Sequence, residues 1–373
     1  MNNGWKYLPF EDCIEGVTYT SKVLRKNFLE DGEFPVISQE QDFVNGYWNN
    51  SNDVFRIKKP VVIFGDHTQV VKYVDFDFVL GADGVKIFQP TDEILPRYFY
   101  YFLVSVELRS LGYARHYRLL KEVIVPVPPI EEQRRIVAIL DETFAAIDKA
   151  KANTERNIQN ARELFDSYLN NIFSNPGPDW ERKRIADICA LKSGTTIPKS
   201  MERKAGDIPY VKVGDMNLPD NESEITTSSR FVNSAEISAN QIIPEGSIIF
   251  PKRGGAIATN KKRAVKIPII ADLNTMAIIP GERLSPELFY HWFKLIDLNE
   301  LSNGTSVPQI NNYSFDDVFI PFPASRDEQK RLTHRLDELN DVSRELKAFC
   351  QNKIAELDEL KKSILQRAFS GEL

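Results

Sequence analysis

Residues 131–142 read EEQRRIVAILDE, and residues 327–338 read DEQKRLTHRLDE. The two stretches align without a gap, because each shared residue of the first recurs 196 positions later in the second. The identical pairs are Glu132/Glu328, Gln133/Gln329, Arg135/Arg331, Leu140/Leu336, Asp141/Asp337 and Glu142/Glu338. Both stretches are rich in residues that favour helices. The chain therefore repeats one helical segment, and this repeat organises the rest of the sequence.

The same spacing continues downstream of both stretches. The further identical pairs are Ile158/Ile354, Leu164/Leu360, Ser167/Ser363, Leu169/Leu365, Phe173/Phe369 and Ser174/Ser370. Repeats of this length usually occur in larger numbers and stack into a solenoid. Two copies, each preceded by a long unlike stretch, instead indicate a pseudo-two-fold object built from one chain.

Each copy is predicted to form one long helix. Ser325, with Glu328 three residues later, is typical of a capping box. Glu131 and Glu132 suit the positive end of a helix that starts after Pro129. No Pro or Gly interrupts either copy before its terminal Phe-Ser. Each helix is therefore expected to run for about forty residues, or roughly 60 to 65 Å.

Apolar residues in both copies follow the spacing of a coiled coil. In the first copy the stripe is interrupted by Lys151 and Thr154, and it comprises Val137, Leu140, Phe144, Ile147, Ile158, Ala161, Phe165, Tyr168 and Ile172. The second copy shifts near Cys350, as in a stutter, and carries Leu332, Leu336, Leu339, Leu346, Phe349, Ile354, Leu357, Leu360, Ile364 and Ala368. We expect the two helices to bury these stripes against each other; the alternative is that each packs on its own globular domain.

The stretch before each helix is predicted to be a mixed α/β globule. Short β-branched and aromatic runs such as PVVIFGDHT and GSIIFPKR, punctuated by Gly and Asp, predict strands and turns. LPRYFYYFL at 95 and SPELFYHWF at 285 echo each other across the two globules. The predicted fold class is α+β, with globules at 1–127 and 175–324 and helices at 128–174 and 325–373.

The composition is that of an ordinary globular protein, with 42% hydrophobic and 27% charged residues. No apolar run approaches the roughly 18 residues of a membrane span, and the start MNNGWKYLPF lacks the apolar core of a signal peptide. We therefore expect a cytoplasmic protein. The three cysteines lie far apart, and the four histidines have no neighbours at zinc-ligand spacing. Neither a disulfide framework nor a metal site is expected.

No enzyme motif stands out in the sequence. It has neither a Walker loop nor a GxGxxG turn, and NPGP at 175–178 breaks the Asn/Asp-Pro-Pro-aromatic pattern of an amino-methyltransferase. Pro178-Asp179 followed by ERK at 202–204 resembles a nuclease motif only loosely, and its first half falls in a linker. We expect no catalytic residue in this chain.

Positive charge is segregated, although the net charge is −6. LRSLGYARHYRLLK at 108–121 and KRGGAIATNKKRAVK at 252–266 hold no acidic residue. One basic run is usually only a solvated face, but one in each globule favours paired contacts to DNA phosphates. His67 is explained equally well by hydrogen bonds within its own turn. The candidate DNA-binding residues are Arg109, Arg115, His116, Tyr117, Arg118, His67, Thr68, Lys252, Arg253, Asn260, Lys261, Lys262, Arg263, Gln309 and Asn311.

Together these features resemble the specificity (S) subunits of type I restriction-modification enzymes. The resemblance covers the whole chain, and it is carried by VPVPPIEEQRRIVAILDE at 125–142, IPFPASRDEQKRLTHRLDE at 320–338 and KKSILQRAFSGEL at 361–373. GTSVPQIN at 304–311 also fits the family pattern. The first globule departs there, since it has GYARHYRLL at 112–120 instead. Its DNA contacts are therefore less transferable.

The resemblance implies two target recognition domains separated by an antiparallel coiled coil. Each domain would read half of a bipartite DNA target, and the helices would set the spacer. The chain itself would be non-catalytic and hold no cofactor. Its partners would be double-stranded DNA, two modification subunits that methylate adenine with S-adenosylmethionine, and restriction subunits that use ATP and Mg²⁺, with no membrane. The residues expected in the coiled coil and in partner binding are Gln133, Arg135, Leu140, Phe144, Ile158, Gln329, Arg331, Leu336, Ile354 and Leu357.

Two other functions remain open from the sequence alone. The first is a coiled-coil scaffold whose globules bind protein, which would show no salt-dependent DNA affinity. The second is a recognition arm for a one-subunit methyltransferase-nuclease, which the chains that co-purify with it would identify.

Overall fold

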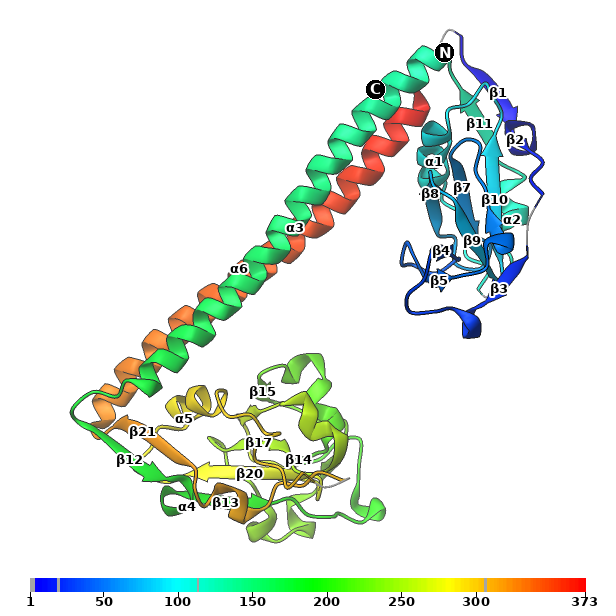
Figure 1. Ribbon diagram of the computed structural model, residues 1–373. Coiled ribbons are helices and arrows are strands. Elements are labelled where there is room, and N and C mark those ends of the chain that lie inside the picture. The colour runs from blue at the N-terminus through cyan, green and yellow to red at the C-terminus, as the bar shows by residue number, and fades with distance from the viewer. Residues whose placement is uncertain (1–3, 19–20, 113, 305–306) are drawn as a thin grey trace. The chain divides into compact units, whose positions relative to one another are not determined.

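The computed structural model, which describes residues 4–18, 21–112, 114–304 and 307–373, forms the two long helices that the repeat predicts (Figure 1). They are α3 (Ile130–Ser174) and α6 (Arg326–Ser370), each of 45 residues. No helix in these residues is long and apolar enough to cross a membrane. The chain divides into unit 1, Met1–Arg156 with Cys350–Leu373, and unit 2, Asn157–Phe349. Each unit thus contains half of each long helix.

The two helices pair in antiparallel fashion, as predicted. In unit 1, Lys151 Nζ lies 2.7 Å from Asp358 Oδ1, and Lys361 Nζ lies 3.1 Å from Asp148 Oδ1. The later residue of α6 faces the earlier residue of α3, so the two helices run in opposite directions. In unit 2, the Arg335 guanidinium lies 5.5 Å from the centre of the Tyr168 ring.

The seam of α3 follows the predicted 4-3 spacing through both units, since none of its positions is exposed. At the seam position of Lys151 a cross-helix ion pair replaces apolar contact. Thr154 is buried, and its hydroxyl donates to the Ala150 carbonyl at 2.8 Å. The two polar interruptions are therefore accommodated without leaving the seam.

The stripe predicted for the second helix is wrong in its middle. Leu339, Leu346, Phe349 and Leu360 are between 38 and 63% exposed. The seam does not stutter: apart from the exposed Lys347, buried or half-buried side chains keep the 4-3 spacing through Leu336, Asn340, Ser343, Cys350, Ile354, Leu357, Lys361, Ile364 and Ala368. The regular seam of the partner helix fixes this register, so polar side chains occupy the seam and larger apolar ones face outward.

The described residues of unit 1 form three sheets and two short α-helices, besides its portions of the long helices. Its elements are β1 (Lys6–Pro9), β2 (Ile14–Glu15), β3 (Lys22–Leu24), β4 (Phe34–Ile37), β5 (Gly46–Trp48), β6 (Val54–Phe55), β7 (Val61–Gly65), β8 (Val71–Val74), β9 (Phe78–Ala82), β10 (Val85–Pro90), α1 (Pro96–Ser105), α2 (Tyr117–Leu120) and β11 (Ile124–Val127). The strand orders are β1-β11, β2-β10-β7-β8 and β3-β9-β4-β5, with β6 also paired to β9. Helix α1 packs against the long helices through Tyr98 and Phe102, whose rings lie 5.2 and 5.4 Å from that of Phe369.

Unit 2 repeats this plan with different strand lengths. Its elements are β12 (Trp180–Arg184), α4 (Ile185–Ile188), β13 (Cys189–Ser193), β14 (Ile208–Val211), β15 (Glu224–Ile225), β16 (Phe231–Val232), β17 (Ile248–Pro251), β18 (Arg263–Val265), β19 (Ile270–Ala271), β20 (Thr275–Pro280), α5 (Pro286–Phe293) and β21 (Phe319–Pro323). The strand orders are β12-β21, β13-β20-β17-β18-β15 and β16-β14-β19. Helix α5 lies in one core cluster with Leu169, Phe173 and Leu336 of the long helices.

The repeat also appears in the contacts that join each globule to the helix that follows it. The first strand of each unit pairs antiparallel with the last strand before the helix, β1 with β11 and β12 with β21. Gln133 and Gln329 are both fully buried at the start of these helices. Gln133 Oε1 accepts from Leu95 N at 2.8 Å, and Gln329 Oε1 accepts from Ser285 N at 2.7 Å. We call each arrangement a glutamine clasp.

Each clasp is completed by the amide nitrogen of the same side chain. Gln133 Nε2 donates to the carbonyls of Glu93 and Pro128 at 2.8 and 2.9 Å. Gln329 Nε2 donates to the carbonyls of Arg283 and Pro323 at 3.0 and 2.8 Å. The oxygen and the nitrogen of each buried side-chain amide are both hydrogen-bonded. These bonds fix the start of the helix against the globule, because the loss of any of them would leave a buried polar group without a hydrogen-bond partner.

Candidate nucleic-acid interface

The basic loop of unit 1 is anchored by a buried aspartate in the turn after β7. Asp66 is 2% exposed, its carbonyl accepts from His116 N at 2.8 Å, and its carboxylate accepts from Tyr117 N at 2.7 Å. The structure therefore brings the GDHT turn and the 108–121 loop together, although about fifty residues separate them in sequence. His67 and Thr68 follow Asp66 in this turn, where Thr68 Oγ1 donates to the Gln39 carbonyl at 2.6 Å.

His116 is placed inside the loop rather than on its surface. Its side chain is 1% exposed, and Leu111 N donates to Nε2 at 3.1 Å. Nε2 is thus the acceptor, so Nδ1 carries the proton and donates to the Asp66 carbonyl at 3.0 Å. With both ring nitrogens bonded, His116 shapes the loop and is unavailable to a base edge in this conformation.

The exposed cations of this loop are Arg109, Arg115, Arg118 and Lys121, of which Lys121 pairs with Glu11 at 2.5 Å. Arg115 also belongs to a cluster that sequence reasoning missed. Burial lowers the pKa of Lys22, and the charges of Lys86 and Arg115 lower it further. Lys22 and Lys86 lie on β3 and β10, far from Arg115 in sequence, so only the sheet topology brings the three like charges together. Asp83 opposes these charges, and Lys22 Nζ donates to the Val85 carbonyl at 3.3 Å. Three cations beside one carboxylate leave an excess of positive charge, which favours an anionic ligand.

Tyr117 is half-buried and bridges the loop to the sheet. Its ring stacks on Phe88 with centroids 5.7 Å apart, and Lys86 Nζ and Lys121 Nζ lie 5.0 and 5.3 Å from its centre. The ring positions the Lys86 and Lys121 ammonium groups at this surface through cation–π contacts. Tyr117 therefore orients cations near the exposed arginines.

In unit 2 the structure pairs two of the candidates across a short bridge. Gly254 N donates to the Pro308 carbonyl at 2.8 Å, and Ile310 N donates to the Lys252 carbonyl at 2.9 Å. This antiparallel bridge sets Arg253 opposite Gln309. Arg253 is exposed and Gln309 is half-buried. An arginine and a glutamine side by side form a pair that can read base edges.

The other candidates of unit 2 mostly hold loops together. Lys252 Nζ donates to Ser193 Oγ at 2.7 Å, and Asn260 Oδ1 accepts from Leu298 N at 3.0 Å. Asn311 Nδ2 donates to the Tyr313 hydroxyl at 2.9 Å. Tyr313 itself is 64% exposed.

The run KKR at 261–263 is divided between surface and interior. Lys261 Nζ contacts Asn217 Oδ1. Lys262 is 6% exposed, its Nζ donates to the carbonyls of Ile296 and Lys294, and burial lowers its pKa to about 8. Arg263 donates to backbone carbonyls, among them that of Met216 at 3.1 Å. The Lys262 ammonium is therefore bonded within the protein, while its charge remains near this surface.

The candidates on the long helices divide in the same way. Gln133, Gln329, Leu140, Phe144 and Leu336 are buried, and Ile158, Ile354 and Leu357 are half-buried in the seam. Only Arg135 and Arg331 are exposed. Arg135 pairs with Glu132 at 2.7 Å and donates to the Leu373 carbonyl at 2.6 Å.

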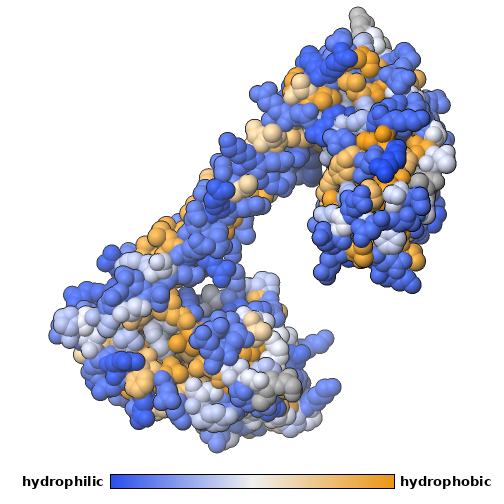
Figure 2. All heavy atoms as spheres, in the orientation of Figure 1, coloured by the Kyte–Doolittle hydropathy of each residue, from blue (hydrophilic) through white to orange (hydrophobic). Residues whose placement is uncertain are grey.

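Exposed apolar residues also occur on the helices. Figure 2 shows apolar patches between hydrophilic residues on the visible surface. The exposed apolar residues of α3 and α6 are Leu164, Leu339, Val342, Leu346, Phe349 and Leu360. Among the described residues, no group of three His, Cys, Asp or Glu side chains is arranged to hold a metal ion.

The chain matches a known protein family along most of its length. Residues 3–158 and 178–356 each match the profile of the type I restriction modification DNA specificity domain. The chain is 24% identical over 359 residues to the Escherichia coli EcoR124I/EcoR124II specificity subunit, covering 91% of this chain and 87% of that one. It is 22% identical over 373 residues to the Escherichia coli EcoBI specificity subunit, covering 88% and 75%.

Solved structures share the fold. A chain from a structure of a type I R-M system superposes with a TM-score of 0.76 at 17% identity, covering 100% of this chain and 99% of that one. The HsdS subunit from Thermoanaerobacter tengcongensis superposes with a TM-score of 0.58 at 18% identity, covering 100% and 98%.

Proposed function

Because the chain belongs to the family of type I restriction-modification DNA specificity proteins, we propose that it reads a bipartite DNA target, one half with each globule. The observation that carries the proposal is the double match at residues 3–158 and 178–356, in which each match spans one globule and a portion of the long helix that follows. The exposed cations of the 108–121 loop in unit 1 and the Arg253–Gln309 pair in unit 2 supply one candidate reading surface per half-site. The same family match disfavours a scaffold that does not bind DNA.

The chain is proposed to contribute recognition and no chemistry of its own. In that arrangement S-adenosylmethionine, ATP and Mg²⁺ belong to partner subunits that methylate adenine or restrict DNA. The helices would set the spacer between the half-sites. The target would be cellular DNA, which makes the cytoplasm the proposed location.

Two modification subunits and the restriction subunits are the proposed partners. A partner that binds twice must meet the same residues twice, and the helices offer such residues. Glu163, Leu164 and Ser167 of unit 2 are exposed, and so are the identical residues Glu359, Leu360 and Ser363 of unit 1. Leu164 is 73% exposed and Leu360 48%. An exposed leucine repeated at the same position of both helices supports duplicated docking.

Methylation mapping tests the proposal. Genomic DNA is sequenced by a single-molecule method from cells that express the chain with a modification subunit, and from cells that lack the chain. We expect a new bipartite motif with methylated adenine in both halves. No new methylation in cells where pull-down confirms the complex would contradict it. Leu164→Glu and Leu360→Glu should each lower the number of bound modification subunits from two to one by native mass spectrometry.

A further inference from the structure

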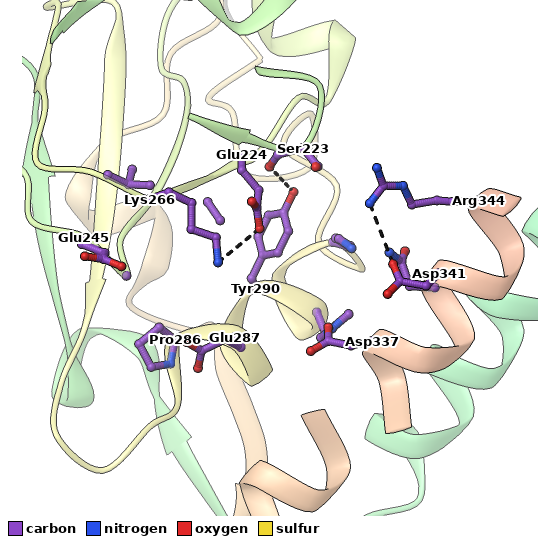
Figure 3. Close-up of a pocket in the computed structure, with 16 residues that line it drawn as sticks. Ser223, Glu224, Glu245, Lys266, Pro286, Glu287, Tyr290, Asp337, Asp341 and Arg344 are labelled. Atoms are coloured by element: carbon purple, nitrogen blue, oxygen red, sulfur yellow. Dashed lines mark hydrogen bonds and ion pairs between the residues drawn. The ribbon is translucent and has the colours of Figure 1, made fainter. Parts of the chain in front are cut away.

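A crevice separates the globule of unit 2 from the long helices beside it. Its larger chamber has a volume of about 710 Å³, and its smaller chamber has a volume of about 330 Å³. The chambers are continuous, because Ser223, Tyr290, Lys294, Asn340 and Arg344 line both. Figure 3 shows Arg344 reaching from α6 toward the globule, on the side of Ser223 and Tyr290.

The two chambers of the crevice differ in charge. Carboxylates gather in the smaller chamber, which Glu224, Glu245, Glu287, Asp337 and Asp341 line (Figure 3). The larger chamber is lined by six basic side chains, Arg162, Lys261, Lys262, Arg263, Lys294 and Arg344, and by two acidic ones, Asp166 and Glu222. The formal charge of the larger chamber is therefore +4 when all of these groups are ionised.

The cations of the larger chamber are poorly neutralised within the chain. Lys262 and Arg263 donate to backbone carbonyls, which leaves their charge in place. The ion pairs of Arg162 with Asp166 and of Arg344 with Asp341 are both 3.9 Å long. Coulomb attraction at that separation near a solvated surface contributes little. The larger chamber thus presents a focused positive field, beside a smaller chamber that is rich in carboxylates.

Lys294 differs from the other cations of the larger chamber because aromatic rings, rather than carboxylates, surround its ammonium group. Its ammonium lies 4.7 Å from the centre of the Tyr290 ring and 5.9 Å from that of Phe165. Among the residues that the structure describes, no carboxylate lies within 4.0 Å of this ammonium. Burial lowers the pKa of Lys294, and the nearby charge of Arg344 lowers it further, against the opposing effect of Asp337 and Asp166. A desolvated cation held this way gains from an incoming anion.

The equivalent position in unit 1 has lost this character. SPELFYHWFK at 285 aligns with LPRYFYYFLV at 95, so Lys294 corresponds to Val104 and Tyr290 to Tyr100. The crevice there is lined by two cations and two carboxylates. Arg97 bonds Asp141 at 2.9 Å beneath three tyrosine rings, and Lys361 pairs with Asp148 at 3.1 Å. At the 196-residue offset Arg344 corresponds to Asp148, so unit 1 lacks both of the cations that Lys294 and Arg344 supply in unit 2.

We propose that the larger chamber of the unit 2 crevice binds phosphates of the DNA backbone, apart from the Arg253–Gln309 pair proposed to read bases. This rests on the proposed function, and it adds that the two halves of the chain hold DNA unequally. Phosphate contacts position a protein on the duplex without reading sequence. Lys294 and Arg344 should therefore set affinity and its salt dependence while leaving the target sequence unchanged.

The experiment compares Lys294→Gln/Arg344→Gln with the unchanged full chain, each bound to its modification subunit. Affinity is measured for a duplex carrying the mapped motif and for a scrambled duplex, over a series of salt concentrations. Loss of two phosphate contacts should make the slope of log affinity against log salt shallower by about 1.8, for both duplexes alike. The matched control is Lys149→Gln/Lys353→Gln, which removes two exposed helix lysines outside the crevice.

Three outcomes would overturn the proposal. The first is an unchanged slope in a variant that still methylates its motif. The second is an equal change in the control pair, since that would report net charge alone. The third is an unchanged slope together with lost binding of ATP to the full chain, which would assign the crevice to a free nucleotide. Absence of any motif-specific binding by the unchanged complex would instead reject the proposed function.

Discussion

The glutamine clasp of unit 2 allows a quantitative test of how the globule is joined to the helix. Gln329→Met keeps the side-chain length and its helix propensity but removes three hydrogen bonds to Ser285 N and to the carbonyls of Arg283 and Pro323. Each stranded buried backbone group costs about 1–3 kcal/mol, and the carbonyl of Arg283 is only partly buried. We therefore expect a loss of about 3–6 kcal/mol in the free energy of unfolding of unit 2.

Urea denaturation followed by tryptophan fluorescence measures this loss. Trp180 and Trp292 belong to unit 2, so Trp5→Phe/Trp48→Phe leaves probes of that unit alone. Gln159→Met, at an exposed position of α3 within unit 2, serves as the control and should stay within about 0.5 kcal/mol. Gln133→Met should produce the same loss in unit 1. A loss below about 1 kcal/mol for Gln329→Met would refute the role given to the clasp.

Three other predictions follow from the junctions and the helices. Burial and the charge of Lys294 lower the pKa of His291 from 6.5, despite its bond to Asp337. The unfolded chain then binds more protons, so unit 2 should lose stability as pH falls through 6.5. Urea titrations should show a smaller loss in His291→Tyr, which copies Tyr101. Insertion of four residues into both 145–160 and the facing 349–364 adds about 6 Å, near two base pairs at roughly 3.4 Å each. Methylation mapping should show a longer spacer with unchanged half-sites, and altered half-sites would contradict the proposal that the helices set the spacer. A circular permutant opened within 175–179 should still bind its partners in pull-down, because Gly4 lies beside Pro129 and Leu373 beside Arg135 at one end of unit 1; a folded permutant without partners would contradict this.

The sequence was sufficient for the two long helices and for the seam of the first, because the 4-3 spacing of its apolar residues reports which face is buried. It failed in the middle of the second helix, where Leu346 and Phe349 are exposed while Ser343 and Cys350 lie in the seam. Register there depends on the facing helix, and hydrophobicity alone does not report it. The seam of α6 keeps the register that the regular seam of α3 imposes, even where polar residues occupy it.

The sequence located the basic runs but did not show which of their side chains face solvent. His116 and Lys262 are buried and bond distant backbone atoms. No sequence pattern distinguishes a cation that staples a loop from one that faces solvent. The cluster of Lys22, Lys86 and Arg115 was missed for the converse reason, since strand pairing alone assembles it.

The clasps also bear on how such a chain can change over generations. The hydrogen bonds that Gln133 and Gln329 make within their globules go to main-chain atoms, at Leu95, Glu93 and Pro128 in one case and at Ser285, Arg283 and Pro323 in the other. Main-chain atoms are present whatever the side chain. Each glutamine clasp therefore tolerates side-chain substitutions in the globule that preserve the local backbone. Mutation is free to rewrite the surface of either globule, or recombination to exchange it, while its attachment to the helices persists.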